Sequence, residues 1–127
     1  MAYTIKVKRN EKKGKVIYNN GTVSVDTTCW WDPAVKIDAG TYSGCYATRL
    51  ANKNDGYDGG KREGIWFGKG VKYNNGTGTA DQIFIHKGTS ASWSDGCIVI
   101  AENELIKIWN SINPKDTPNV TVEVTDE

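Results

Sequence analysis

The N-terminal part of the chain alternates between apolar and polar side chains in short runs separated by polar breaks. In the run 4–8 the apolar residues fall on one face of a strand and the lysines on the other, because successive side chains of a strand point to opposite faces. A second run, 15–18, is followed by Asn20 and Gly21, a pair typical of tight hairpin turns. The pattern predicts three strands, the third at 22–25.

The middle of the chain continues this β-type pattern with more frequent glycines. The segment 35–50 is long enough for one extended strand, or for two strands that break near Gly40 or Gly44. The segment 51–62 is rich in Asn, Asp and Gly and predicts a loop, which either contacts substrate or merely connects two strands. A strand, a turn and a strand are predicted next, at 64–68, 74–78 and 83–86.

One helix is predicted near the C-terminus, at about 102–112. Its apolar residues recur at steps of three and four, and two glutamates in its first turn suit the positive end of the helix dipole. Pro114 ends the helix, and the alternating run 120–124 predicts a last strand. These elements predict a mainly β fold, a curved mixed sheet or sandwich with one principal helix, in a single domain that spans 1–127.

Composition and charge exclude several classes of partner. The 127 residues carry a net charge of +1, so the whole protein has no field that favours nucleic acid or anionic lipid. No apolar run approaches the roughly 20 residues of a membrane-spanning helix, and the segment 1–6 lacks the apolar core of a signal peptide. We therefore expect no nucleic-acid partner, no membrane span, and synthesis in the cytoplasm without a signal peptide.

The chain has three cysteines and a single histidine. An odd number of cysteines leaves one thiol unpaired within the monomer, and Cys97 is the natural one for a catalytic role. Cys29 and Cys45 could pair only if their strands lie side by side, and cytosolic synthesis disfavours that bridge. A zinc site built from the three cysteines and His86 lacks the usual ligand spacings, so we expect no metal and no cofactor.

His86 and Cys97 carry the strongest chemical signal. His86 ends the apolar run 83–86, and Cys97 follows eleven positions later, between Gly96 and a second apolar run. The thiolate is the reactive form of cysteine, and an imidazole can take the thiol proton, so the two side chains could form a nucleophile–base pair. The alternative is a satisfied core histidine and a small buried thiol.

The residues around this pair resemble the signature of L,D-transpeptidase catalytic domains. In that family an Ile-His-Gly-like segment precedes a variable loop and then Ser-His-Gly-Cys with an aliphatic residue; here the segments are Ile-His-Lys-Gly at 85–88 and Ser-Asp-Gly-Cys-Ile at 94–98. The stretch 37–42, Ile-Asp-Ala-Gly-Thr-Tyr, is similar to the family's Pro-x-Gly-x-Tyr strand. The resemblance covers roughly 23–112, and with the run 26–29 it is closer to compact relatives in phages and bacterial toxin loci, including type VI-secreted L,D-transpeptidase effectors.

Three features depart from the pattern of the main family. Asp95 stands where the family has a second histidine, Val99 stands where an Arg or Asn follows the Cys-aliphatic pair, and the loop from His86 to Cys97 is shorter. These departures concern the oxyanion hole and the choice of acyl donor, whereas the nucleophile and its base are retained.

The resemblance implies an acyl-transfer mechanism. Cys97 attacks a carbonyl carbon and forms a thioester, while His86 takes the thiol proton and returns one to the leaving amine. The backbone carbonyl of Lys87 would hold the imidazole in the right tautomer. Asp95 is the alternative orienting group, although we favour its other role, that of a turn residue that helps to expose the nucleophile.

The remaining candidate residues surround the nucleophile. Backbone N–H groups of Asp95, Gly96 and the nucleophile itself would form the oxyanion hole, because Gly96 lets the chain approach closely. Ser94 is expected to hydrogen-bond within this turn. Trp93 either stacks on substrate or caps the core, and Tyr42 is a further candidate for substrate binding.

The resemblance implies the stem peptide of bacterial peptidoglycan as substrate, cut or exchanged after meso-diaminopimelate or a similar diamino acid. Water would give an L,D-carboxypeptidase (a hydrolase), an amine of another stem a crosslinking L,D-transpeptidase (a transferase), and a free D-amino acid an exchange. The toxin-type and phage relatives imply an immunity protein or delivery machinery as partners, and action in the periplasm or cell wall after delivery or lysis. The alternative is a non-catalytic cell-wall-binding or virion-structural module in which Cys97 is inert.

Overall fold

The structure is a computed structural model, and it describes residues 3–11, 13–94 and 96–127. Strands dominate it, with one α-helix and one short 3-10 helix in the described part of the chain. The elements are β1 (Tyr3–Arg9), β2 (Gly14–Asn19), β3 (Ser24–Trp30), β4 (Gly40–Leu50), β5 (Arg62–Trp66), β6 (Val71–Tyr73), β7 (Gly78–Ala80), β8 (Phe84–Lys87), η1 (Ala91–Trp93), β9 (Ile98–Ile100), α1 (Glu102–Ser111) and β10 (Val120–Asp126).

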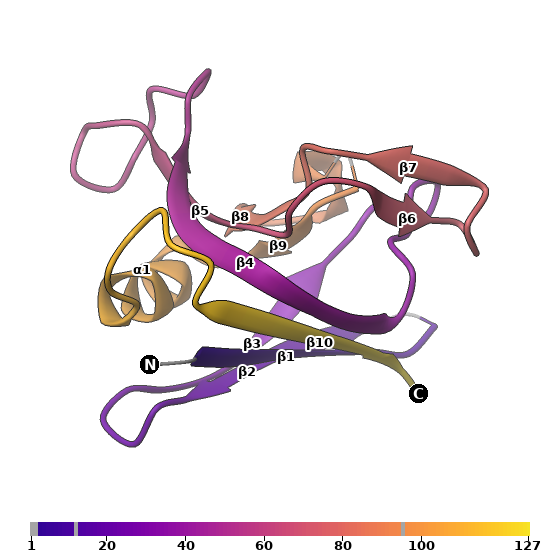
Figure 1. The fold of residues 1–127 in the computed structure, drawn as a ribbon, viewed down its shortest axis with the longest axis horizontal. Helices are drawn as coiled ribbons and strands as arrows, with labels where there is room; N and C mark the ends of the chain where they lie inside the picture. The colour runs from indigo at the N-terminus through magenta and orange to yellow at the C-terminus, as the bar shows by residue number, and fades with distance from the viewer. Residues whose placement is uncertain (1–2, 12, 95) are drawn as a thin grey trace.

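Eight strands form one sheet that closes on itself, in the order β1-β10-β4-β5-β8-β9-β3-β2, with β2 pairing again with β1. Two neighbouring pairs are parallel, β1 with β10 and β8 with β9. The other pairs in this sheet are antiparallel. This curved mixed sheet with its single α-helix confirms the predicted mainly β fold class (Figure 1).

The alternation in the sequence becomes an alternation in burial. In β1 and β2 every second side chain is buried, and the lysines between them are exposed. Four apolar side chains of these two strands are buried in the space that the closed sheet surrounds: Ile5, Val7, Val16 and Tyr18. The same core receives residues of β8, β9 and β10, namely Ile85, Ile98, Ile100, Val120 and Val122.

The helix α1 begins and ends within one residue of the predicted bounds. Its buried face carries Leu105, Ile106 and Ile108, and it packs against β5, β8 and β3. The indole N–H of Trp109 donates to the carbonyl oxygen of Thr48 at 2.9 Å, which ties the helix to β4. Figure 1 shows the helix at the opposite end of the molecule from the small β6–β7 hairpin. In the described chain no helix is both long and apolar enough to span a membrane.

The bounds of several strands differ from the predictions for physical reasons. The turn after β2 is longer than two residues, because the side chain of Asn20 accepts hydrogen bonds from the N–H groups of Thr22 and Val23. The third strand therefore begins at Ser24 and runs on to Trp30 rather than covering 22–25.

The segment after Ala39 forms one unbroken strand, β4, and not two. Gly44 has a φ of 75°, and the register between β4 and β10 shifts opposite it, between Val120 and Val122. An irregularity of this kind absorbs an unusual backbone conformation without ending the strand. Arg62, which the composition assigned to the loop, is the first residue of β5.

Candidate active site

Two neighbouring parallel strands position His86 and Cys97. The register of β8 and β9 pairs Ile85 with Ile98 and His86 with Val99, and Cys97 directly precedes β9. Alternate residues of a strand share a face, so Cys97 lies on the same face as Val99 and as its partner His86. The parallel crossover between the two strands thus brings the only histidine and the predicted nucleophile to one side of the sheet.

A single cavity of about 290 Å³ is lined by both side chains. His86 is 4% exposed and Cys97 is 7% exposed, so solvent and any ligand reach them through this cavity. β4 and the loop after it, β5, β8, η1 and the residue before β9 contribute to its walls. The lining residues are Leu50, Ala51, Asn52, Lys53, Arg62, Gln82, Phe84, His86, Trp93 and Cys97.

The tautomer of His86 follows from its hydrogen bond. Its Nδ1 lies 2.8 Å from the carbonyl oxygen of Lys87. A carbonyl oxygen only accepts, so Nδ1 carries the hydrogen, and Nε2 of the neutral ring holds the lone pair. This is the arrangement that a general base needs, and it matches the orienting role that the resemblance implies for Lys87.

The surroundings of His86 keep its imidazole neutral. Burial lowers the pKa of His86, and the nearby charges of Arg62 and Lys53 lower it further, against the opposing effects of the bond to Lys87 and the carboxylate of Asp55. Two cations near an imidazole disfavour a third positive charge. At neutral pH the ring is therefore in the form that can accept a proton.

This environment gives a direct spectroscopic prediction. Because His86 is the only histidine, its ring gives one set of imidazole signals, and an NMR titration should place its midpoint below the ordinary value of about 6.5. Arg62→Gln should move the midpoint up, since it removes a charge that lowers the pKa. A midpoint at or above that value in the folded wild type would contradict this description of the site.

Of the three cysteines, Cys97 is the one that lines this cavity. The backbone N–H of Phe84 donates to its Sγ at 3.4 Å, and the thiol donates to the carbonyl oxygen of Gln82 at 3.6 Å. An N–H donor stabilises negative charge on the sulfur. Burial raises the pKa of Cys29 to about 12 and the pKa of Cys45 to about 11, so both are poor nucleophiles at neutral pH.

The three cysteines occupy separate places, and no disulfide joins them in the described chain. Cys29 lies in β3 and Cys45 in β4, and these strands are not neighbours in the sheet. Within residues 3–11, 13–94 and 96–127, no three His, Cys, Asp or Glu side chains form a cluster that could hold a metal ion.

The turn before Cys97 is held by Ser94. The hydroxyl of Ser94 donates to the carbonyl oxygen of Cys97 at 2.6 Å, and the N–H of Gly96 donates to the same hydroxyl at 3.2 Å. The Gly96 N–H is thus used inside the turn, and an oxyanion role for this group would require it to leave Ser94. Asp95, the other residue expected at the oxyanion hole and as an alternative orienting group, lies outside the described residues.

Gly96 is required by its backbone conformation. Its φ of 103° lies in the region that favours glycine. A Cβ at this position would come within 3.0 Å of side-chain atoms of Ile83 and Val35. The residue before Cys97 is therefore fixed as glycine by both conformation and packing.

The two aromatic candidates lie in different places. Trp93, in η1, lines the cavity and is 42% exposed. Tyr42 does not appear among the described residues that line it. Its ring packs edge-on against Phe67 with centroids 5.2 Å apart, and its hydroxyl donates to the carbonyl oxygen of Asp38. The structure therefore brings Trp93 to the cavity and leaves Tyr42 away from it.

Arg62 is the main feature of the cavity that the sequence did not single out. Its Nε and Nη2 donate to the two carboxylate oxygens of Asp55, at 2.9 and 2.6 Å, and its guanidinium lies 5.5 Å from the ring centroid of Trp93. The guanidinium holds the pKa of Asp55 at about 2. The sequence showed only a basic residue between a polar loop and a short apolar strand, which is a weak signal.

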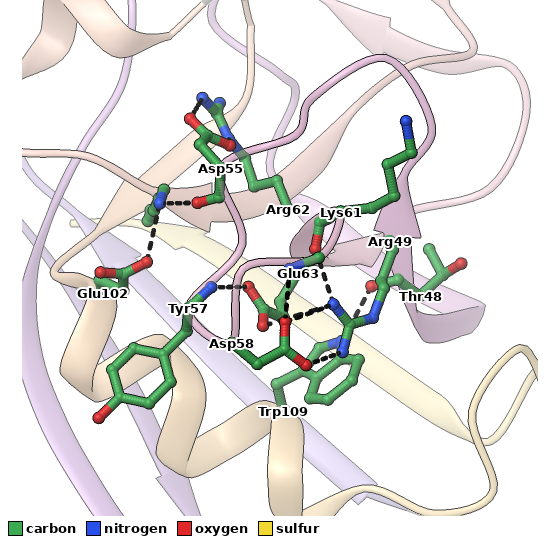
Figure 2. Close-up of polar contacts among 12 residues, drawn as sticks. Thr48, Arg49, Asp55, Tyr57, Asp58, Lys61, Arg62, Glu63, Glu102 and Trp109 are labelled. Carbon is green, nitrogen blue, oxygen red and sulfur yellow. Dashed lines mark hydrogen bonds and ion pairs between the residues drawn. The ribbon is translucent and has the colours of Figure 1, made fainter.

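A second arginine anchors the far part of the loop 51–61, as Figure 2 shows. Arg49 donates to both carboxylate oxygens of Asp58, at 3.1 and 2.9 Å, and stacks 4.9 Å from the ring centroid of Trp109. Glu63 is only 2% exposed, and it accepts a hydrogen bond from the backbone N–H of Tyr57 at 3.0 Å. The loop above the cavity is therefore held by charged side chains at several points.

Lys87 joins the same loop to the helix. Its Nζ forms an ion pair with Glu102 at 2.8 Å and donates to the backbone carbonyl oxygen of Asp55. The residue whose carbonyl orients His86 thus also connects β8, the loop and the N-terminus of α1 through its side chain.

Comparison with known families identifies the class of protein. The family model of the L,D-transpeptidase catalytic domain, YkuD, matches residues 11–124. The match covers most of the 127 residues, so the chain belongs to the L,D-transpeptidase catalytic domain family. Members of this family act in general as peptidoglycan transpeptidases. A search of curated protein sequences gave no match.

One solved structure shows the same fold. The catalytic domain of the Enterococcus faecium L,D-transpeptidase, determined by NMR with that protein acylated by ertapenem, superposes with a TM-score of 0.52 at 16% identity and covers 98% of both chains. Mycobacterium tuberculosis L,D-transpeptidase 1 gives a TM-score of 0.47 at 13% identity, covering 98% of this chain and 63% of that one.

Proposed function

We propose that the protein is a cysteine-dependent acyltransferase that acts on peptidoglycan stem peptides through a thioester at Cys97. The observation that carries the proposal is the cavity that Cys97 shares with a neutral His86, whose Nδ1 is held by the carbonyl oxygen of Lys87. Membership of the family supplies the reaction class.

The first half of the reaction forms the thioester. His86 Nε2 takes the proton of the Cys97 thiol, and the sulfur forms a bond to the carbonyl carbon of the peptide. The tetrahedral intermediate then collapses, the C–N bond breaks, and the proton on His86 passes to the leaving amine. The N–H of Phe84, which contacts Sγ at 3.4 Å, favours the negative sulfur at the start of this step.

The second half releases the acyl group. Water, an amine of a second stem or a free D-amino acid attacks the thioester carbon and gives its proton to His86. The C–S bond breaks, and the Cys97 sulfur takes the proton back from the imidazole, which restores the thiol and the neutral ring. The three nucleophiles give the carboxypeptidase, transpeptidase and exchange activities, and all three use the same two side chains.

The proposed substrate lies outside the cytoplasm, so we also propose that the protein acts in the periplasm or cell wall, as a single domain, after delivery or lysis. A bacterial toxin effector with an immunity protein, or a phage protein, would fit this site of action. These assignments rest on the resemblance around His86 and Cys97 and on the proposed chemistry.

Thiol reactivity separates the enzyme from a non-catalytic wall-binding module. In the native protein, iodoacetamide should modify Cys97 at neutral pH well before Cys29 and Cys45, because their pKa values are raised to about 12 and about 11 and neither side chain is exposed by more than 2%. Peptide mass spectrometry at several time points gives the three rates. His86→Ala should slow only the modification of Cys97.

The denatured protein is the control for this measurement, since all three thiols should then react at similar rates. If Cys97 of the native protein reacts no faster than Cys29 and Cys45, the thiol is inert and the module is the better interpretation.

A further inference from the structure

The cavity that contains Cys97 has a positive wall. Two of its lining residues, Arg62 and Lys53, are cationic, and none of the described residues that line it is Asp or Glu. Both charges act on His86, whose pKa they lower. A cavity with this lining favours an anionic ligand group over a neutral or cationic one.

Arg62 is held in place, and one edge of its guanidinium is left available to a ligand. Its Nε and Nη2 donate to the carboxylate of Asp55, and the guanidinium carbon lies over the ring of Trp93. Its Nη1 makes no hydrogen bond to any residue that the structure describes, and it is not one of the buried polar atoms without a partner. The side chain as a whole is 10% exposed and lines the cavity. One N–H edge of a fixed guanidinium can therefore reach a ligand.

A second arginine, Arg49, holds the same loop without lining the cavity. Arg49 forms an equivalent two-point pair with Asp58 and also stacks on a tryptophan, Trp109. Arg49 does not line the cavity. Of these two arginines, only Arg62 lines the cavity that contains His86 and Cys97.

We propose that Arg62 binds a carboxylate of the peptide substrate, with Lys53 as the second cation, and thereby selects acidic stem peptides. This inference rests on the proposed function of the site. A guanidinium is well suited to a carboxylate, because its planar N–H donors match the carboxylate oxygens. The substrate offers this group in two places: the free C-terminus of the residue that leaves, and the side chain of a diamino acid such as meso-diaminopimelate.

Three peptides of one length distinguish which of these two carboxylates Arg62 binds. The first is a stem tetrapeptide with meso-diaminopimelate and a free C-terminus, the second is its C-terminal amide, and the third has lysine in place of the diaminopimelate. The kcat/KM of each is measured by chromatography of the products for the wild type, Arg62→Gln, Arg62→Lys and the matched control Arg49→Gln.

We expect the wild type to prefer the first peptide over at least one of the other two. Arg62→Gln should lower kcat/KM for the first peptide by about 10- to 100-fold, the loss expected when one charge-assisted hydrogen bond is removed. The loss should be clearly smaller for the peptide that lacks the recognised carboxylate, because only the effect of Arg62 on the pKa of His86 remains there. Arg62→Lys should retain part of the preference, and Arg49→Gln should change all three peptides by one common factor.

Two results overturn the inference while the proposed function stands. One is a wild type that cleaves all three peptides equally well, a result that does not depend on the folding of any variant. The other is an Arg62→Gln enzyme whose loss is the same for all three peptides, as for Arg49→Gln, which would assign Arg62 a purely structural role. A folded wild type that cleaves none of them overturns the proposed function and this inference with it.

Discussion

Cys97→Ala should abolish the turnover of purified stem peptides and leave the melting temperature nearly unchanged. The reaction needs a nucleophile that forms a covalent intermediate, and alanine offers none. The change removes one atom from a side chain that lines a cavity, so it disturbs little packing. The measurement is product formation by chromatography, with thermal unfolding of the same sample.

His86→Ala should lower the rate by about 10²–10⁴-fold, as loss of a general base typically does. Cys29→Ala and Cys45→Ala are the matched controls, because each removes a buried thiol elsewhere in the core, and each should retain activity if it folds. Full activity in Cys97→Ala would end the enzyme interpretation.

The second large effect is expected in living cells. Expression of the wild type in a Gram-negative cytoplasm should be tolerated, because the proposed substrate is absent there. Fusion to a secretory signal peptide should place the protein beside peptidoglycan and cause growth arrest, swelling or lysis. Growth curves and microscopy after induction measure the effect, and it should vanish in both Cys97→Ala and His86→Ala.

The exported variants make this experiment specific. Equal toxicity of the exported wild type and of exported Cys97→Ala would show that the damage does not come from catalysis. If the exported wild type is folded, abundant and harmless, the non-catalytic binding module becomes the better interpretation.

The local patterns predicted much of the fold, because they depend on neighbouring residues. The alternation in β1 and the three- and four-residue steps of α1 predicted those elements closely. The position of β3 was missed because a side chain, Asn20, extended the turn before it. The closure of the sheet, through the parallel pairing of β1 with β10, joins the two ends of the chain and has no local signal.

The residues of the site also divide into those that a local pattern predicts and those that depend on long-range contacts. His86 and Cys97 stood out because their residue types and spacing are unusual in a chain with one histidine. Arg62 did not, since its role in the cavity depends on Asp55, from the loop, and on Trp93, from η1. Long-range contacts of this kind arise only when β5, the loop and η1 come together in the folded chain.

The most direct test of the central claim is the mass of the protein during turnover. The wild type is mixed with a stem tetrapeptide, quenched in acid within the first turnovers and measured intact, and a digest then locates any adduct. We expect the mass of the protein to increase by the mass of the peptide minus its leaving amino acid. The adduct should lie on Cys97 as a thioester that hydroxylamine removes, and it should be absent from Cys97→Ala. Turnover without such an adduct, or an adduct that persists in Cys97→Ala, would contradict the central claim.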